Sequence, residues 1–238
     1  MISIKDAYLR VQDNIVQAAH TCGRDPDEIK LVVVSKSQPV EKIQAAIDVG
    51  IRLFGENYPE EARQKIQKLR PPVDVHWHMI GHLQSRKIKI CVEQFQMIQS
   101  VDSLRLAIKL DNYLSALKAE PYPILLEMNV SGEESKFGFP GWDDASLDKA
   151  LFEIEALLNL EHLKVQGVMA IPPLFDNPEL SRPFHRRLYN IREQFMLKFP
   201  QQDWRDISSG TSYDYKVAIQ EGATYVRVGQ AIMGARVK

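Results

Sequence analysis

Cysteine is scarce in this chain of 238 residues, which contains only Cys22 and Cys91. Two cysteines are too few for the disulfide framework of a small secreted domain. Neither stands in a CxxC pair or a Cys/His cluster, which argues against structural zinc. Both lie in apolar stretches with helical spacing, so we expect two buried, reduced thiols.

Long hydrophobic runs and an excess of charge are also lacking. No apolar run approaches the roughly 18 to 20 residues needed to cross a bilayer, and the charged residues throughout 1–15 are unlike a signal peptide. The 30 Lys and Arg nearly balance the 31 Asp and Glu, for a formal net charge of -1. This balance disfavours a general nucleic-acid or membrane-surface partner. We therefore expect a cytoplasmic protein.

Several well-known motifs are absent: Walker A, G-x-G-x-x-G, G-x-S-x-G and H-E-x-x-H do not occur. His76 and His78 would share one face of a strand and could bind a metal ion. No third ligand follows at a recognised spacing, so we predict no metal site. His78 would then line a pocket or make a hydrogen bond in the core.

The apolar residues that are present, 45% of the chain, suffice for a large core. Beyond the first 30 residues, short apolar runs alternate with stretches of helical spacing. Many of these runs are rich in β-branched residues and bounded by Gly, Pro or Ser, as strands are. The eight predicted strands are 31–35, 51–55, 75–81, 95–101, 124–130, 165–171, 206–210 and 225–229.

The stretches between these runs place apolar residues three and four positions apart, as amphipathic helices do. A similar stripe over 4–22 predicts a helix ahead of the first strand. Eight strand–helix units indicate a parallel α/β sheet and close most naturally into a single (β/α)8 TIM barrel. An open doubly wound sheet is the alternative. We expect one domain over 1–238, with 1–30 forming the N-terminal helix and lead-in.

Lys36 directly follows the first predicted strand. In a (β/α)8 barrel the carboxyl ends of the strands carry the functional site. A lysine partly desolvated there has a lowered pKa and can form a Schiff base with an aldehyde. The alternative is a solvated lysine that opens a loop, and its position alone does not decide between the two.

The last two predicted strands end in segments suited to an anion. Ser208–Ser212 offers hydroxyl and backbone N–H donors, although simple helix capping would also explain it. Val226–Ala231 adds a second Gly turn, and the loops after strands seven and eight commonly bind phosphate. Arg227, between two valines, would point into the barrel interior or form an ion pair. Asn57 follows a Gly turn that would place its amide side chain at the barrel rim beside the first strand. The alternative is an ordinary turn that leads into a helix.

Six motifs occur in an order that resembles one known family, the pyridoxal-phosphate homeostasis proteins. The resemblance covers nearly the whole chain from Leu31 onward and is specific because the motifs are independent. They are LVVVSK, FGENYPEEA, WHMIGHLQSRK, GVMAIPP, SSGTSYDY and VRVGQAIMGAR.

This resemblance implies an alanine-racemase-like barrel that holds pyridoxal 5'-phosphate (PLP) as an aldimine on Lys36. It places Asn57 and Met169 near the cofactor ring, and Arg227 opposite the ring nitrogen, which makes the ring a weaker electron sink. The segments that surround the phosphate contain Ser208, Thr211, Ser212, Gly229 and Gln230. Two of these depart from the family pattern, which usually has Met at the position of Thr211 and Thr or Ser at that of Gln230.

A PLP lysine usually belongs to an enzyme, and racemases of this fold type pair the barrel with a second β domain. We expect the barrel and one helix to use all 238 residues here. An exposed cofactor without a second base suits PLP storage and supply rather than catalysis. We therefore expect a monomeric carrier without catalytic residues, with PLP-dependent apoenzymes as candidate recipients. A racemase-like PLP enzyme and a cofactor-free Schiff-base aldolase are the alternatives.

Overall fold

Eight parallel strands close into a barrel in the computed structural model, which describes residues 2–235. Around the ring each strand pairs with its neighbours, and pairing of Ile98 with Ile124 closes it between the fourth and fifth strands. The strands are β1 (Lys30–Val34), β2 (Leu53–Glu56), β3 (His76–Met79), β4 (Met97–Val101), β5 (Tyr122–Asn129), β7 (Leu163–Met169), β8 (Asp206–Ser208) and β9 (Tyr225–Val228).

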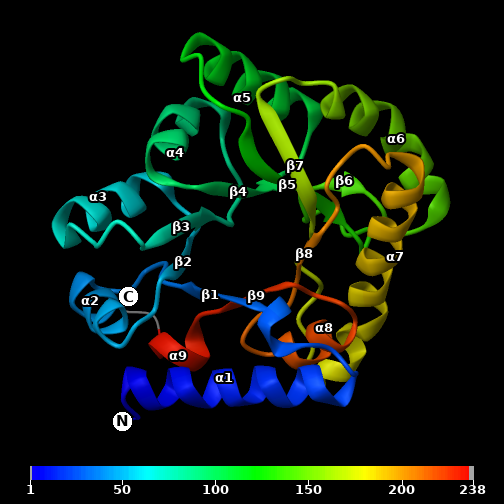
Figure 1. Cartoon of the computed structure of the whole chain (residues 1–238). Coiled ribbons are helices and arrows are strands. Elements are labelled where there is room, and N and C mark those ends of the chain that lie inside the picture. Colours follow the sequence, from blue (N-terminus) through cyan, green and yellow to red (C-terminus); the bar gives the residue numbers. More distant parts are fainter. Residues whose placement is uncertain (1, 236–238) are drawn as a thin grey trace.

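Each barrel strand is followed by an α-helix, and these helices surround the barrel (Figure 1). Short 3-10 helices occupy three of the connections, η1 (Pro26–Glu28), η2 (Ser85–Lys87) and η3 (Pro178–Ser181). The α-helices after the strands are α2 (Val40–Asp48), α3 (Pro59–Leu69), α4 (Ile88–Gln94), α5 (Leu104–Ala116), α6 (Asp144–Leu158), α7 (Arg182–Lys198), α8 (Tyr215–Gln220) and α9 (Gln230–Met233).

The eight strands predicted from the sequence all form, and the predicted TIM barrel is confirmed over the open sheet. The pairing of β4 with β5 decides between these two architectures, because an open sheet would leave both of these edges unpaired. One strand was not predicted: β6 (Phe139–Pro140) pairs with the end of β5 outside the ring. Its two residues are too short to give a periodic pattern.

The predicted N-terminal helix is α1 (Ile4–Thr21). It begins at Ser3, whose hydroxyl accepts a hydrogen bond from the backbone N–H of Asp6, as a good N-cap does. Its buried stripe, which includes Val11 and Ile15, packs against α8 and α9 on the outside of the barrel (Figure 1). The expectation of two buried thiols is wrong for Cys22, which is exposed just after this helix, while Cys91 is buried.

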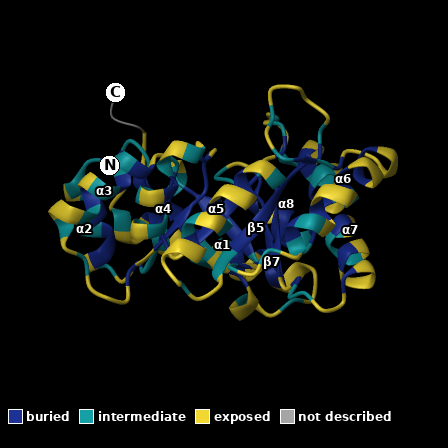
Figure 2. Ribbon diagram, turned by 90° about the horizontal axis from the view of Figure 1, so that it is seen from above, coloured by how far each residue is buried: buried dark blue, intermediate teal, exposed yellow. Residues whose placement is uncertain are grey.

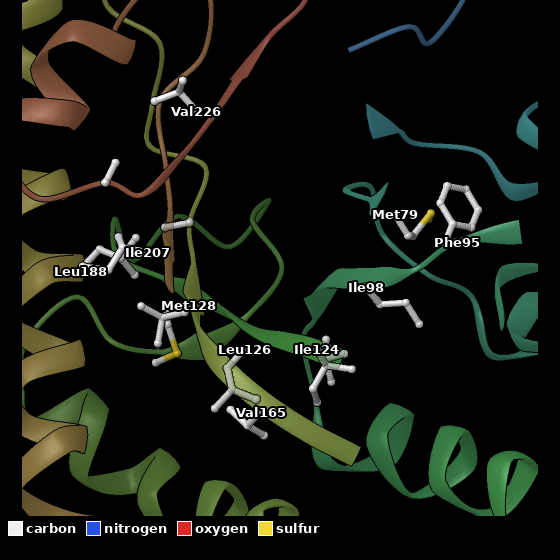
Figure 3. Close-up of a cluster of buried hydrophobic side chains, with 14 of the residues drawn as sticks. Met79, Phe95, Ile98, Ile124, Leu126, Met128, Val165, Leu188, Ile207 and Val226 are labelled. Atoms are coloured by element: carbon white, nitrogen blue, oxygen red, sulfur yellow. The ribbon is translucent and has the colours of Figure 1, made fainter. Parts of the chain in front are cut away.

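The main hydrophobic core fills the space between the strands and the helices. Figure 2 shows buried residues along the strands and exposed residues on the outer faces of the helices. Ile98, Ile124, Leu126 and Val165 of three adjacent strands belong to this core (Figure 3). Truncation of a fully buried residue such as Ile124 to Ala would cost about 2 to 5 kcal/mol. Among the described residues, no helix is long and apolar enough to span a bilayer.

The barrel interior is partly polar. Because successive strand residues face opposite sides, Ile98 joins the outer core while its neighbour Met97 joins Leu125 and Met169 in a separate buried cluster. Arg227 points into the interior, as its place between two valines suggested, and is 4% exposed. The other buried polar side chains on these strands include His78, Gln99, Glu127 and Ser208. This interior forms the floor of the candidate site.

Candidate functional site

A cavity of about 320 Å³ opens at the carboxyl ends of the strands. It contains seven of the nine residues that the sequence singled out: Lys36, Asn57, Thr211, Ser212, Arg227, Gly229 and Gln230. They come from the ends of β1, β2, β8 and β9 or from the loops that follow. Since β1 pairs with both β2 and β9, the residues Lys36, Asn57 and Gly229, which follow the carboxyl ends of these three strands, meet at one rim of the barrel.

Met169 and Ser208, the other two predicted residues, are not in the cavity wall. Met169 is fully buried against Met97 and Leu125 inside the barrel. Ser208 is also fully buried, and its hydroxyl accepts a hydrogen bond from Arg227. Both side chains are buried in the barrel interior, where Ser208 contacts the cavity wall through Arg227.

Arg227 is held in place by two hydrogen bonds. Its guanidinium donates to Oγ of Ser208 at 2.5 Å and to the carbonyl oxygen of Ala170 at 2.8 Å. Burial lowers the pKa of Arg227 to about 10, so the side chain is still a cation at neutral pH. Below it, burial and then the charges of His76 and Lys30 lower the pKa of His78 to about 3. The interior histidine is therefore neutral.

The loops after β8 and β9 bring hydroxyl and backbone N–H groups to the cavity wall. Ser212 Oγ accepts hydrogen bonds from the N–H groups of Gly229 and Ala231 at 3.1 and 3.3 Å. Thr211 donates through both its N–H and its hydroxyl to Asp214. Burial opposes ionisation of Asp214, yet hydrogen bonds from His185 and Thr211 lower its pKa below the usual value. This charged acceptor orders the loop between β8 and α8.

The sequence did not indicate Lys136, which also lines the cavity. Asn129, at the end of β5, accepts hydrogen bonds from the N–H groups of Ser131 and Gly132 and so shapes the loop that follows. Nζ of Lys136 then donates to the carbonyl oxygens of Ile171 and Pro172. An Asn-x-x-Gly turn after a predicted strand was the available signal.

Glu127, on β5, is a second residue that the sequence did not indicate. It is 6% exposed, and its Oε2 has no hydrogen-bond partner. Burial and then the charge of Asp102 raise its pKa to about 7, against the opposing effect of Arg227 and Lys136. A carboxyl with this pKa can change its protonation near neutral pH beneath the cavity.

A larger hollow of about 920 Å³ lies at the amino ends of β1, β8 and β9. Its arginines already have partners: Arg24 donates to the carbonyl oxygens of Ile219 and Ala223, and Arg186 pairs with Glu221. It lies at the end of the barrel away from Lys36. In residues 2–235, no group of three or more His, Cys, Asp or Glu side chains is placed to hold a metal ion.

Comparison with known proteins matches residues 9–237 to the family model of the alanine racemase N-terminal domain. The chain is 38% identical over 240 residues to a pyridoxal phosphate homeostasis protein of Escherichia coli (strain K12), with 99% of this chain and 98% of that protein covered.

Two solved structures are similar at 32% sequence identity. An unknown protein from Bifidobacterium adolescentis superposes with a TM-score of 0.86, covering 96% of this chain and 94% of that one. PipY of Synechococcus elongatus PCC7942, solved with PLP bound, superposes with a TM-score of 0.78, covering 92% and 100%.

Proposed function

Because the chain belongs to the pyridoxal phosphate homeostasis protein family, we propose that it binds PLP as a Schiff base on Lys36 and supplies the cofactor without catalysing a reaction. A single observation carries this proposal. One cavity contains an amine, a guanidinium and a group of hydroxyl and N–H donors, in Lys36, Arg227, Ser212 and Gly229. An aldehyde, a pyridine nitrogen and a phosphate need these three kinds of partner.

The phosphate end of this proposed site fits an anion. Hydroxyl and N–H donors can replace the hydration of phosphate oxygens. A Cβ at Gly229 would lie 3.2 Å from both Cβ and the carbonyl oxygen of Val34, so a larger residue would crowd the rim beside Lys36. Thr211 and Gln230 depart from the family pattern, and both already make hydrogen bonds, to Asp214 and from Tyr213. We propose that Ser212 contributes most to phosphate binding, because its Oγ accepts from the N–H groups of Gly229 and Ala231 and keeps its own hydroxyl proton to donate.

The covalent step needs a neutral amine at Lys36. Its Nζ attacks the aldehyde carbon, a carbon–nitrogen double bond forms, and the aldehyde oxygen leaves as water with both amine protons. Bound PLP supplies an electron-withdrawing ring that can stabilise negative charge. Arg227 opposes that effect, because a cationic donor facing the ring nitrogen disfavours its protonation. This supports a carrier more than a catalyst.

A racemase-like enzyme is the alternative, and one residue favours it. Tyr213 lines the same cavity, is 55% exposed and donates its phenolic proton to Oε1 of Gln230. A phenol can act as an acid or base on a bound amino acid.

We further propose that the carrier works in the cytoplasm as a monomer and that its chain forms one PLP-binding domain. PLP-dependent apoenzymes are the proposed recipients of the cofactor.

Absorption spectroscopy tests the proposal directly. Wild-type protein mixed with PLP should develop the visible band of a Schiff base, and reduction with borohydride should fix the added mass on Lys36. Lys36→Ala should lose the band, whereas Lys109→Ala, which removes an exposed lysine on α5, should keep it. A wild-type protein that never develops the band contradicts the proposal. Incubation of the loaded protein with single enantiomers of amino acids then separates the two functions, since rapid loss of optical rotation would identify a racemase.

A further inference from the structure

Lys36 lies in a tight turn with an unfavourable backbone. The N–H of Gln38 donates to the carbonyl oxygen of Ser35 at 3.1 Å, which closes a turn of four residues after β1. Ser37, the residue after Lys36, has a φ of 56°, in the left-handed region that residues other than glycine rarely adopt. Something outside the turn must stabilise this conformation.

Lys65, on α3, contacts the turn on the amino side of Lys36. Its Nζ donates to the carbonyl oxygen of Ser35 at 2.7 Å, although Lys65 is 30 positions away in the sequence. The same Nζ lies 2.7 Å from Oε1 of Glu56 and 2.6 Å from Oε1 of Glu61. Lys65 thus donates hydrogen bonds to Ser35 and Glu56 and forms an ion pair with Glu61.

Glu61 contacts the turn on the other side of Lys36. Its Oε1 accepts a hydrogen bond of 2.7 Å from the N–H of Ser37. Glu56, at the end of β2, also accepts one of 2.7 Å from the hydroxyl of Ser35. The residues directly before and after Lys36 are therefore both bound to one cluster of three charged side chains, Glu56, Glu61 and Lys65.

This cluster is well placed to act as a rigid support. The side chains of Lys65 and Glu56 are 7% and 0% exposed, so water competes little for their hydrogen bonds. Glu56 is on β2, which pairs directly with β1, and Lys65 is on α3, the helix that follows β2. None of the three lines the cavity that contains Lys36, so they act on the lysine only through its backbone.

We propose that Lys65, together with Glu56 and Glu61, positions Lys36 by holding the left-handed turn at Ser37. This inference rests on the proposed function, because it assigns the cluster the task of presenting the Lys36 amine to an aldehyde. In the absence of the cluster, the turn relaxes to backbone conformations that point Lys36 elsewhere. The cluster makes the amine ready for reaction before PLP arrives.

The main test uses Glu61→Ala, because Glu61 is partly exposed and its removal leaves the buried Lys65–Glu56 pair intact. We expect the dissociation constant for PLP to rise about tenfold. This factor corresponds to the free-energy cost of holding a residue other than glycine in the left-handed conformation. The matched control is Glu60→Ala, which removes the neighbouring carboxylate on α3, bound to Lys87 at the surface. Its dissociation constant should stay that of the wild type.

Ser37→Gly provides a rescue that a merely structural role would not predict. Glycine adopts positive φ without the cost that serine has. The double variant Glu61→Ala/Ser37→Gly should therefore recover most of the lost affinity, although the carboxylate is still missing. Weaker binding that Ser37→Gly does not restore, or unchanged binding in Glu61→Ala, overturns the inference.

A second measurement does not depend on PLP. The rate at which an amine-reactive reagent labels Lys36 in the cofactor-free protein, followed by mass spectrometry across pH, should change in Glu61→Ala and return in the double variant. If wild-type protein fails to form a Schiff base while this pattern holds, the proposed function fails and the positioning role stands. If the band forms but neither binding nor labelling responds to Glu61→Ala, only the positioning role fails. Lys65→Met, where it folds, should match or exceed the effect of Glu61→Ala.

Discussion

The guanidinium of Arg227 is linked to the ring of His78 through two intervening side chains. Arg227 donates to Ser208 at 2.5 Å, Ser208 donates to Oε1 of Gln99 at 2.6 Å, and Nε2 of Gln99 lies 2.9 Å from Nδ1 of His78. Each donor points away from Arg227, so Nδ1 of the neutral histidine is the acceptor and its proton is on Nε2. This series of hydrogen bonds runs through the barrel interior and fixes the direction of the Arg227 guanidinium, which lines the cavity.

Ser208→Ala should break this chain at its first link. Arg227 loses an acceptor, and a lost hydrogen bond to a buried charge costs about 1.5 to 3 kcal/mol. We expect the free energy of unfolding in urea to fall by that amount, and the affinity for PLP to fall because the guanidinium is less well oriented. Ser115→Ala, an exposed serine on α5, is the control and should change neither. An unchanged stability in Ser208→Ala would contradict the assigned hydrogen bonds.

Glu127 should make the protein less stable as the pH rises. Its pKa is about 7 in the folded protein, above the ordinary value of 4.5, so folding favours the protonated form. Between these values the unfolded chain loses the proton first, and the stability falls by on the order of 3 kcal/mol. Urea unfolding of Glu127→Gln across this range should lack that decline relative to wild type. Glu133→Gln, on the exposed loop, should keep it.

His78 should act in the opposite direction. Its pKa is about 3 in the folded protein, below the ordinary value of 6.5, so folding favours the neutral ring. As the pH falls from about 6.5 towards 3, the unfolded chain takes up the proton first and stability is lost. Below neutral pH the slopes of His78 and Glu127 therefore partly cancel in the wild type. His78→Gln, which keeps an acceptor for Gln99, should reveal a steeper decline with rising pH; an unchanged curve would be evidence against this opposition.

Gly81→Ala should weaken the site through Asn57. A Cβ on Gly81 would lie 2.7 Å from the Cα of Asn57, too close for a carbon–carbon contact, so the backbone of Asn57 must move. Since Asn57 lines the cavity, we expect the affinity for PLP to fall about tenfold, equivalent to about 1.4 kcal/mol. Titration of Gly81→Ala, Asn57→Ala and the double variant tests this. The two losses should not add, because both act through one side chain; full additivity would show that Gly81 acts elsewhere.

The fold was predictable because its signal is local and repeated. Each barrel strand is a short apolar run of its own, and eight of them alternating with helical stretches leave few architectures. The same periodicity did not predict that Cys22, at the end of a helix, is exposed. Cys22 lies in an apolar stretch but falls one residue past the end of α1, where the chain turns outward. The strand β6 was not predicted because its two residues are too few to show an alternating pattern.

The candidate site was predictable only where residues follow strand ends in recognisable motifs. Lys36, Asn57 and Ser212 belong to such motifs and, together with Arg227 within the last strand, line one cavity. Lys136 follows β5 without a familiar motif, and Met169 and Ser208 have the right position along the chain but point below the cavity. Whether a residue at a strand end faces the mouth or the interior depends on the strand's register and tilt, which sequence spacing alone does not determine.

By itself, the sequence determined a parallel barrel, its added N-terminal helix and the family to which the chain belongs, because periodicity and ordered motifs are properties of the linear chain. Only the tertiary structure decided which distant residues support Lys36. Lys65 and Glu61 lie on α3, a helix with many charged residues, and from the sequence alone it looks like any solvent-exposed helix. Their contacts to Ser35 and Ser37 arise because β2 lies beside β1, and hydrogen bonds between residues so far apart along the chain exist only once these two strands have paired.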